Sequence, residues 1–143
     1  METTTQITIE RPADLVFSVV SDMSRNPEWQ KGMKSCTWTS DPPIREGSTY
    51  DQVAEFLTRN IITSFEVVEF EPDRKIRIKS VKSTFPLDIT RSVEPTGEFR
   101  CQVTAVVTGE PSGVLKWLNP MIKPLVARSV RKDYERLKVL LDG

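Results

Sequence analysis

The sequence contains no histidine, the side chain that enzymes use most often for proton transfer near neutral pH. Histidine is also the commonest metal ligand, so zinc hydrolysis and the usual serine or cysteine triads have no ligand set or base here. The two cysteines, Cys36 and Cys101, are far apart and lack metal-ligand spacing, and we expect two reduced, packed thiols. The sequence therefore predicts no metal and no other cofactor.

Glycine, net charge and long apolar runs are scarce as well. The six glycines form neither a GxGxxG nor a GxxxxGK loop, which disfavours nucleotide enzymes. The 20 basic and 20 acidic residues balance, so no overall field favours nucleic acid or an anionic membrane. No run approaches the roughly 18 apolar residues of a membrane span, and the opening METTTQITIE lacks the pattern of a signal peptide. We expect a cytoplasmic protein without stable membrane insertion.

The chain of 143 residues shows no repeat, linker or low-complexity tract, which predicts one domain over residues 1–143. Alternation from Thr3 to Glu10 predicts a half-buried strand. Pro12 suits the opening of a short helix, and Ser24 can cap a second short turn that Trp29 closes. The first helix is supported by apolar residues at helical spacing: Leu15, Val16, Val19 and Val20.

From Met33 to Thr108 the apolar pattern has period 2 and is interrupted by turn signals, which predicts six strands in a meander. In the segment from Lys75 to Lys79, Ile76 and Ile78 must face the core while the basic residues face water. Such a sheet has one dry and one wet side, as antiparallel sheets commonly do. The dry side needs a cover.

The C-terminal segment supplies that cover as a long amphipathic helix. Asn119 and Pro120 suit its cap and first turn, and Pro124 should bend it or break its hydrogen-bond ladder, so we expect a kink between residues 119 and 124. The apolar stripe expected to face the sheet consists of Leu118, Met121, Ile122, Leu125, Val130, Tyr134, Leu137 and Leu141.

This order of elements, with several short motifs, resembles the α+β helix-grip fold of the START-like superfamily (SRPBCC, Bet v 1-like), and in particular the small bacterial polyketide cyclase/dehydrase-like members. The motifs are Ile9 to Phe17 (I-x-R-P-A-D-x-V-F), Asp22 to Trp29, Glu46 to Tyr50, Glu66 to Pro72 and Tyr134 to Lys138. The resemblance covers almost the whole chain. It implies a curved seven-stranded antiparallel sheet, two short helices and a long C-terminal helix that enclose a cavity for an apolar molecule.

The candidate ligand-binding residues follow from the implied cavity and from strand parity, because side chains two apart share a face. They are Trp29, Trp38, Tyr50, Gln52, Phe56, Ile78, Phe85, Ile89, Arg91, Val103, Trp117, Met121 and Leu125. Most of these also suit an ordinary core, and Trp29 suits a packing wedge between the short helices and the first meander strand. Arg91 lies at an inward position, where an unpaired charge is costly, so it either pairs with an acidic side chain or anchors a ligand.

Three functions fit these observations. The first is non-catalytic binding or carriage of a small hydrophobic molecule, such as a lipid or polyketide. The second is a cyclase, aromatase or dehydratase in which Asp51, Glu55, Tyr50 or Arg91 orients a substrate or moves protons, although parity turns Asp51 and Glu55 toward solvent. The third is a protein-interaction module with an unknown partner, as in some branches of the superfamily. The basic residues of the C-terminal helix are explained by its dipole and by interleaved acids.

Overall fold

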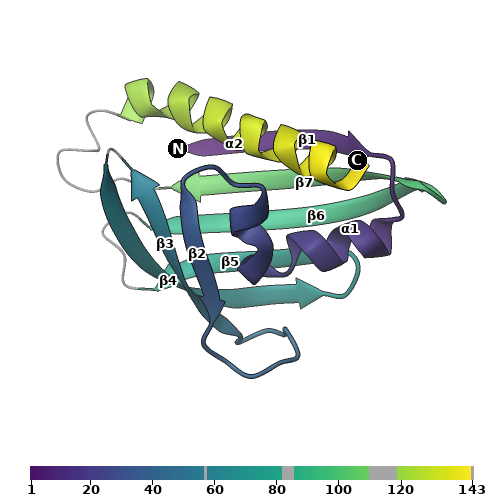
Figure 1. The fold of residues 1–143 in the computed structure, drawn as a ribbon, viewed down its shortest axis with the longest axis horizontal. Coiled ribbons are helices and arrows are strands. Elements are labelled where there is room, and N and C mark those ends of the chain that lie inside the picture. The colour runs from purple at the N-terminus through teal and green to yellow at the C-terminus, as the bar shows by residue number, and fades with distance from the viewer. Residues whose placement is uncertain (57, 82–85, 110–118, 143) are drawn as a thin grey trace.

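The computed structural model describes residues 1–56, 58–81, 86–109 and 119–142, with the side chains of all except 56 and 119–122. Its core element is an antiparallel sheet with the helices on one face (Figure 1). The strands are β1 (Glu2–Ile9), β2 (Met33–Trp38), β3 (Thr49–Phe56), β4 (Arg59–Glu71), β5 (Lys75–Val81), β6 (Leu87–Gly97) and β7 (Arg100–Gly109). Their order is β1-β7-β6-β5-β4-β3-β2, which confirms the predicted meander and places β1 beside the last strand.

The alternation predicted for the strands is present in the sheet. Ile76 and Ile78 of β5 are buried, whereas the alternate residues Lys75 and Arg77 lie on the outer face. In β7 the buried residues are Cys101, Val103, Ala105 and Val107, again every second position. A single dry face results, and the helices cover it.

Two short helices connect β1 to β2. Helix α1 (Ala13–Val20) follows Pro12 and buries Val16, Phe17, Val19 and Val20. The second, η1 (Met23–Glu28), is a 3-10 helix that ends at Trp29, as predicted. The predicted cap at Ser24 is wrong: the Asp22 carboxylate occupies that role and accepts from the Ser24 N–H at 3.1 Å and the Ser24 hydroxyl at 2.6 Å. An ionised carboxylate is the stronger acceptor, and the same oxygen also accepts from Trp38 Nε1 at 2.9 Å.

The long helix α2 (Asn119–Asp142) continues through Pro124, so the proline does not end it, and the residues before Asn119 lie outside the described part of the chain. Tyr134 and Leu137 are buried, and Val130 and Leu141 pack against the core. Leu125 is 68% exposed, so its predicted place on the buried stripe is wrong, because this part of α2 borders a groove instead of the sheet. No helix among the described residues is long and apolar enough to cross a membrane.

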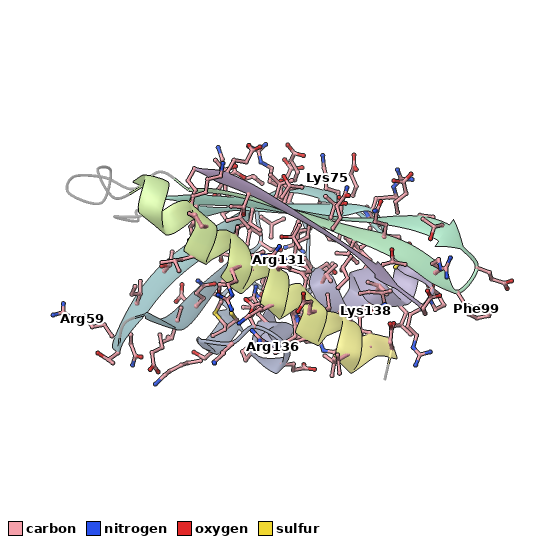
Figure 2. All side chains as sticks on the ribbon, turned by 90° about the horizontal axis from the view of Figure 1, so that it is seen from above. Arg59, Lys75, Phe99, Arg131, Arg136 and Lys138 are labelled. Carbon is pink, nitrogen blue, oxygen red and sulfur yellow. The ribbon has the colours of Figure 1, made fainter. Side chains whose placement is uncertain are left out.

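The C-terminal end of α2 is tied to β1 and the residues after it (Figure 2). Lys138 Nζ donates to the Thr8 carbonyl at 2.6 Å, and the Glu10 N–H donates to the Asp142 carboxylate at 2.9 Å. Arg11 Nε donates to the Leu141 carbonyl at 2.7 Å. These bonds fix the C-terminal end of α2. The direction of α2 across the sheet is set by further contacts of Asp133 and Arg136, near the middle of the helix.

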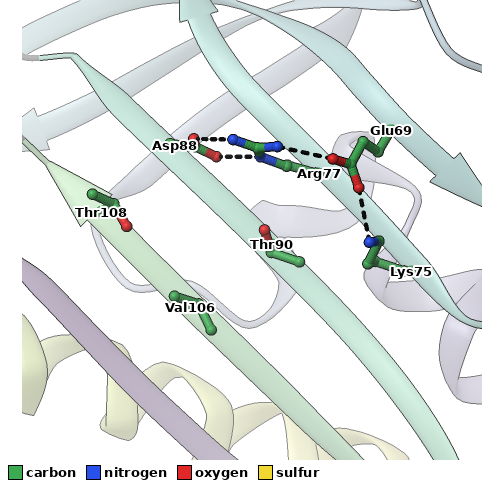
Figure 3. A pocket seen from close by; sticks show the side chains of 7 residues that line it. All are labelled: Glu69, Lys75, Arg77, Asp88, Thr90, Val106 and Thr108. Atoms are coloured by element: carbon green, nitrogen blue, oxygen red, sulfur yellow. Dashed lines mark hydrogen bonds and ion pairs between the residues drawn. The ribbon is translucent and has the colours of Figure 1, made fainter.

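The outer face of the sheet carries a network of ion pairs around a depression of about 240 Å³ (Figure 3). Arg77 forms two parallel bonds to the Asp88 carboxylate, at 3.0 and 2.8 Å, and a third to Glu69 at 2.8 Å. Lys75 holds the other oxygen of Glu69 at 2.8 Å. Hydrogen bonds from these cations lower the pKa of Glu69 and of Asp88. The network thus satisfies its own charges and favours no bound ion.

The Asp22 cap predicts a specific loss of stability. Asp22→Ala removes the acceptor for Ser24 and Trp38 and should lower the free energy of unfolding by about 1–2 kcal/mol in urea titrations. Asp22→Asn keeps an acceptor oxygen and should recover most of that loss. Equal losses in the two variants would contradict the capping role.

The ion-pair network predicts a pH-dependent effect. The pKa of Glu69 and Asp88 is lower in the folded state, so the network stabilises the protein above the unfolded carboxyl pKa of about 4 and loses its effect as the pH falls through the lowered values. Arg77→Gln should therefore lower the melting temperature by about 2–4 °C at pH 7 and by progressively less below pH 4.

The control for this network is Arg74→Gln, which removes an equal charge from an exposed arginine that has no ion pair among the described residues. It should leave the melting temperature nearly unchanged at both pH values. A loss for Arg77→Gln that persists unchanged at low pH would show that packing of the side chain, and not its charge, is responsible.

Candidate functional site

A groove of about 690 Å³ opens between the first half of α2 and the ends of β2 and β3. We call it the α2 groove. It is lined by Lys31, Gly32, Glu55, Thr58, Leu125, Arg128, Ser129, Lys132 and Arg136. Gly32 has a φ of +87°, a conformation that favours glycine, and a Cβ there would meet the Glu55 carbonyl oxygen at 3.3 Å. At this edge of the groove, the backbone at Gly32 therefore lies close to the backbone at Glu55.

The inner limit of the α2 groove is set by Asp133 and Arg136, which attach the middle of α2 to the segment between η1 and β2. The Asp133 carboxylate accepts the Lys31 N–H at 3.2 Å and pairs with Arg136. Arg136 Nε also donates to the Trp29 carbonyl at 3.1 Å. Burial raises the pKa of Asp133, and the bonds from Lys31 and Arg136 oppose that shift. In the described residues, the side-chain bonds that hold α2 begin at Asp133, and the groove is lined by four residues of the preceding turns: Leu125, Arg128, Ser129 and Lys132.

Beyond this attachment lies an aromatic cluster between α2 and the sheet. Trp29 meets Tyr134 of α2 edge to face, with ring centroids 4.9 Å apart. Tyr50 of β3 stacks on Phe65 of β4 at 5.1 Å and meets Trp38 of β2 edge to face at 5.3 Å. Such contacts stabilise the fold beyond the area they bury. Trp29 is 1% exposed, while Trp38 is half-buried.

Arg91 of β6 is buried in this cluster with 2% of its surface exposed. Its Nη1 donates to the Val20 carbonyl at 3.0 Å and to Asn26 Oδ1 at 2.9 Å. The guanidinium also lies over the Trp29 ring, 4.8 Å from its centroid, and interacts with the Tyr134 hydroxyl. No acidic side chain forms an ion pair with it among the described residues, so the first of the two alternatives for Arg91, an acidic partner, is not found in them. The end of α1 supplies the compensating negative dipole.

Three donors in the cluster have no hydrogen-bond partner within the described part of the chain. They are Trp29 Nε1, the Tyr50 hydroxyl and Arg91 Nε. Each buried donor without an acceptor costs about 1–3 kcal/mol, so an incoming acceptor oxygen would be favoured here. Burial raises the pKa of Tyr50, which keeps its hydroxyl protonated and able to donate. The arrangement can bind a carbonyl, hydroxyl or water oxygen.

The other candidate residues fall into three groups. Ile78 and Val103 are fully buried on the dry face, and Gln52 and Ile89 are half-buried. Leu125 borders the α2 groove, at its exposed edge. The predictions for Phe85 and Trp117, and for the side chains of Phe56 and Met121, lie outside the described residues.

Two carboxylates considered for catalysis lie away from the unpartnered donors. Asp51 is exposed and accepts from the Ser64 hydroxyl at 2.7 Å. Glu55 is exposed at the rim of the α2 groove and pairs with Lys34 at 3.0 Å. The described residues contain no group of three or more cysteine, aspartate or glutamate side chains that could hold a metal. Neither carboxylate therefore lies among the unpartnered donors of the described residues.

Sequence reasoning missed the sheet side of the α2 groove and Asn26, and it placed Tyr134 on the buried stripe of α2 without a role at the site. No local pattern marks Lys31, Gly32 or Asn26, because their role comes from contacts with distant segments. The four-residue spacing of Arg128, Lys132 and Arg136 was the available signal, since such residues share one helix face. Their position on α2 explained them equally well as charges that complement the helix dipole.

Several solved structures share the fold of this chain at low sequence identity. TTHA0849 from Thermus thermophilus has a TM-score of 0.82 at 18% identity, over 96% of this chain and 94% of that chain. The Zhui aromatase/cyclase from a Streptomyces species has a TM-score of 0.81 at 12% identity, over 99% and 93%. A START superfamily protein from Mycobacterium smegmatis has a TM-score of 0.69 at 17% identity, over 95% and 98%. At these identities the likeness shows the fold, which is the predicted START-like helix-grip fold.

A search of the curated proteins found no match to the sequence. The family profile described as "Polyketide cyclase / dehydrase and lipid transport" matches residues 1–142. That match spans nearly every residue of the chain, including all the elements that build the α2 groove and the aromatic cluster. The chain therefore belongs to the polyketide cyclase/dehydrase and lipid transport family.

Proposed function

We propose that this protein binds or carries a small hydrophobic molecule between α2 and the sheet, without catalysing a reaction on it. The molecule enters through the α2 groove, whose volume of about 690 Å³ lies within the usual range of about 300–1,000 Å³ for ligand sites. The observation that carries the proposal is the set of buried donors on Trp29, Tyr50 and Arg91 that have no partner in the described part of the chain.

The chemistry of this region suits an apolar molecule with one or two oxygen atoms. The core between α2 and the sheet is aromatic and aliphatic, so a ligand that reaches it buries apolar surface. The donors supply the few placed polar groups that orient a ligand. Because Trp29 and Tyr50 are rigid aromatic side chains, their donors lose little conformational freedom when an acceptor arrives.

A cyclase or aromatase activity is the second candidate. It is favoured by the fold shared with the Zhui aromatase/cyclase and by the Tyr50 hydroxyl and Arg91 Nε, which could polarise a carbonyl group. A cyclisation also needs a base to remove a proton. Asp51 faces away, and Glu55 is held by Lys34 at the rim, so binding without reaction is the better account of these residues.

Mass spectrometry of organic extracts from the purified protein tests the proposal most directly, with an unrelated protein prepared alongside as the control. A stoichiometric apolar molecule supports carriage and reveals its class. A protein with no extracted molecule that also fails to bind the neutral probe N-phenyl-1-naphthylamine would contradict the proposal.

The unpartnered Tyr50 hydroxyl yields a prediction that separates binding from stability. Tyr50→Phe removes a donor that has no acceptor among the described residues, so the free energy of unfolding should stay unchanged or rise by about 1 kcal/mol. Affinity for Prodan, an apolar fluorophore with a carbonyl acceptor, should fall about five- to tenfold, while affinity for N-phenyl-1-naphthylamine, which lacks that carbonyl, should not change.

Tyr134→Phe is the matched control because it also removes a buried hydroxyl, but one that interacts with Arg91. It should destabilise the protein by about 1 kcal/mol and leave the preference for the carbonyl probe intact. If the two variants behave alike toward Prodan, the Tyr50 hydroxyl is not a ligand donor.

The route through the α2 groove predicts that filling it blocks binding. Ser129→Trp places a bulky side chain in the groove without changing its charge and should weaken N-phenyl-1-naphthylamine binding at least tenfold in a fluorescence titration. Val139→Trp adds the same side chain at an exposed position of α2 away from the groove and should bind normally. Normal binding by both variants would rule out this entrance.

A further inference from the structure

The described residues that line the α2 groove include more basic than acidic side chains. Three of its cations, Arg128, Lys132 and Arg136, come from one face of α2, and Lys31 faces them from the sheet side. Glu55 is the only acid in the lining among the described residues. A chain with equal numbers of basic and acidic residues thus concentrates positive charge at this opening.

The spacing of the helix cations makes a continuous row. Positions four apart lie on the same face of a helix and are separated by about 6 Å along its axis. Like charges at this spacing repel each other, and the repulsion lowers the stability of an isolated helix. The row is therefore unfavourable unless negative charges compensate it.

Ion pairs compensate only part of this charge. Arg136 is held by Asp133 and by the Trp29 carbonyl, and Glu55 is held by Lys34. Within the described residues, the hydrogen bonds and ion pairs include none from the side chains of Lys31, Arg128 and Lys132, although all three line the groove. Three cations around one opening are left for an external anion.

We propose that the α2 groove binds the anionic head group of a small amphiphile, a phosphate or a carboxylate, through Lys31, Arg128 and Lys132. This inference rests on the proposed function and assigns an orientation to the ligand. The head group stays at the groove, beside the exposed Leu125, and the apolar part extends toward the aromatic cluster. Hydrogen bonds to a charged group are about twice as strong as neutral ones, so the head group would add affinity and select against neutral apolar molecules.

The test compares ligands that differ only in the head group. Dodecyl phosphate, dodecanol and dodecyltrimethylammonium displace N-phenyl-1-naphthylamine from the protein, each below its micelle-forming concentration. We expect dodecyl phosphate to bind at least tenfold more tightly than dodecanol, dodecyltrimethylammonium to bind most weakly, and the preference to shrink between about 50 and 500 mM salt.

Two double variants of α2 separate the groove from the general charge of the helix. The variant Arg128→Gln/Lys132→Gln removes two groove cations and should abolish the preference for dodecyl phosphate while binding dodecanol normally. The variant Lys123→Gln/Arg131→Gln removes two exposed cations of the same helix that do not line the groove and should keep the preference. Equal loss in both variants would overturn the proposal in favour of unspecific attraction.

Two further arms identify the source of the anion. Inorganic phosphate that displaces the probe as well as dodecyl phosphate does would indicate a site for a free anion and overturn the amphiphile. Binding to phosphatidylglycerol vesicles but not to phosphatidylcholine vesicles, without any preference among the soluble ligands, would indicate a membrane surface and overturn it as well. If the neutral probe binds and no head-group preference appears, this inference fails while the proposed function stands.

Discussion

The burial of the Arg91 guanidinium determines how the helices are arranged over the sheet. A cation with 2% of its surface exposed must be compensated inside the protein, and no carboxylate among the described residues forms an ion pair with it. Its compensation comes from neutral groups, the Val20 carbonyl at the end of α1 and the amide oxygen of Asn26 in η1. These bonds fix both short helices relative to β6.

The position of α2 depends on the same arrangement through Trp29. The indole lies against the guanidinium on one side and meets Tyr134 of α2 on another, and its backbone carbonyl accepts from Arg136. Arg91 also interacts with the Tyr134 hydroxyl, so one strand residue contacts all three helical elements. Because aromatic packing and cation–π contacts depend on geometry, a shift of η1 would disturb the attachment of α2 and with it the groove.

The sequence predicts the fold well because its signals are local. Alternation at two residues and apolar spacing at three and four residues are visible in short windows, and they identify the first strand, the meander and the long helix. The cap at Ser24 failed because two adjacent polar residues, Asp22 and Ser24, could each take that role, and the fold added Trp38 as a second donor to Asp22. Leu125 failed because amphipathic spacing shows which face is apolar but not where the sheet ends.

The candidate site is less predictable because its contacts join distant segments. Strand parity shows that Arg91 points inward, but its acceptors lie 65 and 71 residues away, where nothing in the sequence marks them. The Lys31 N–H reaches Asp133 across 102 residues. The spacing of Arg128 and Lys132 places them on one helix face, but only the fold shows that this face borders an opening.

The site divides into an interior with donors and a charged rim, and this division limits what it can do. Inside, the partnerless groups of Trp29, Tyr50 and Arg91 are donors, and burial keeps the Tyr50 hydroxyl protonated, so they can hold an oxygen atom but cannot remove a proton. At the rim, cations attract an anion and Glu55 already has a cation partner. A bound amphiphile would satisfy both regions at once, with its oxygen atoms inside and its charge outside. A reaction would additionally require a base among the donors, and the described side chains supply none there. Under the proposed function, the donors inside and the cations at the rim would therefore contact two different parts of one molecule.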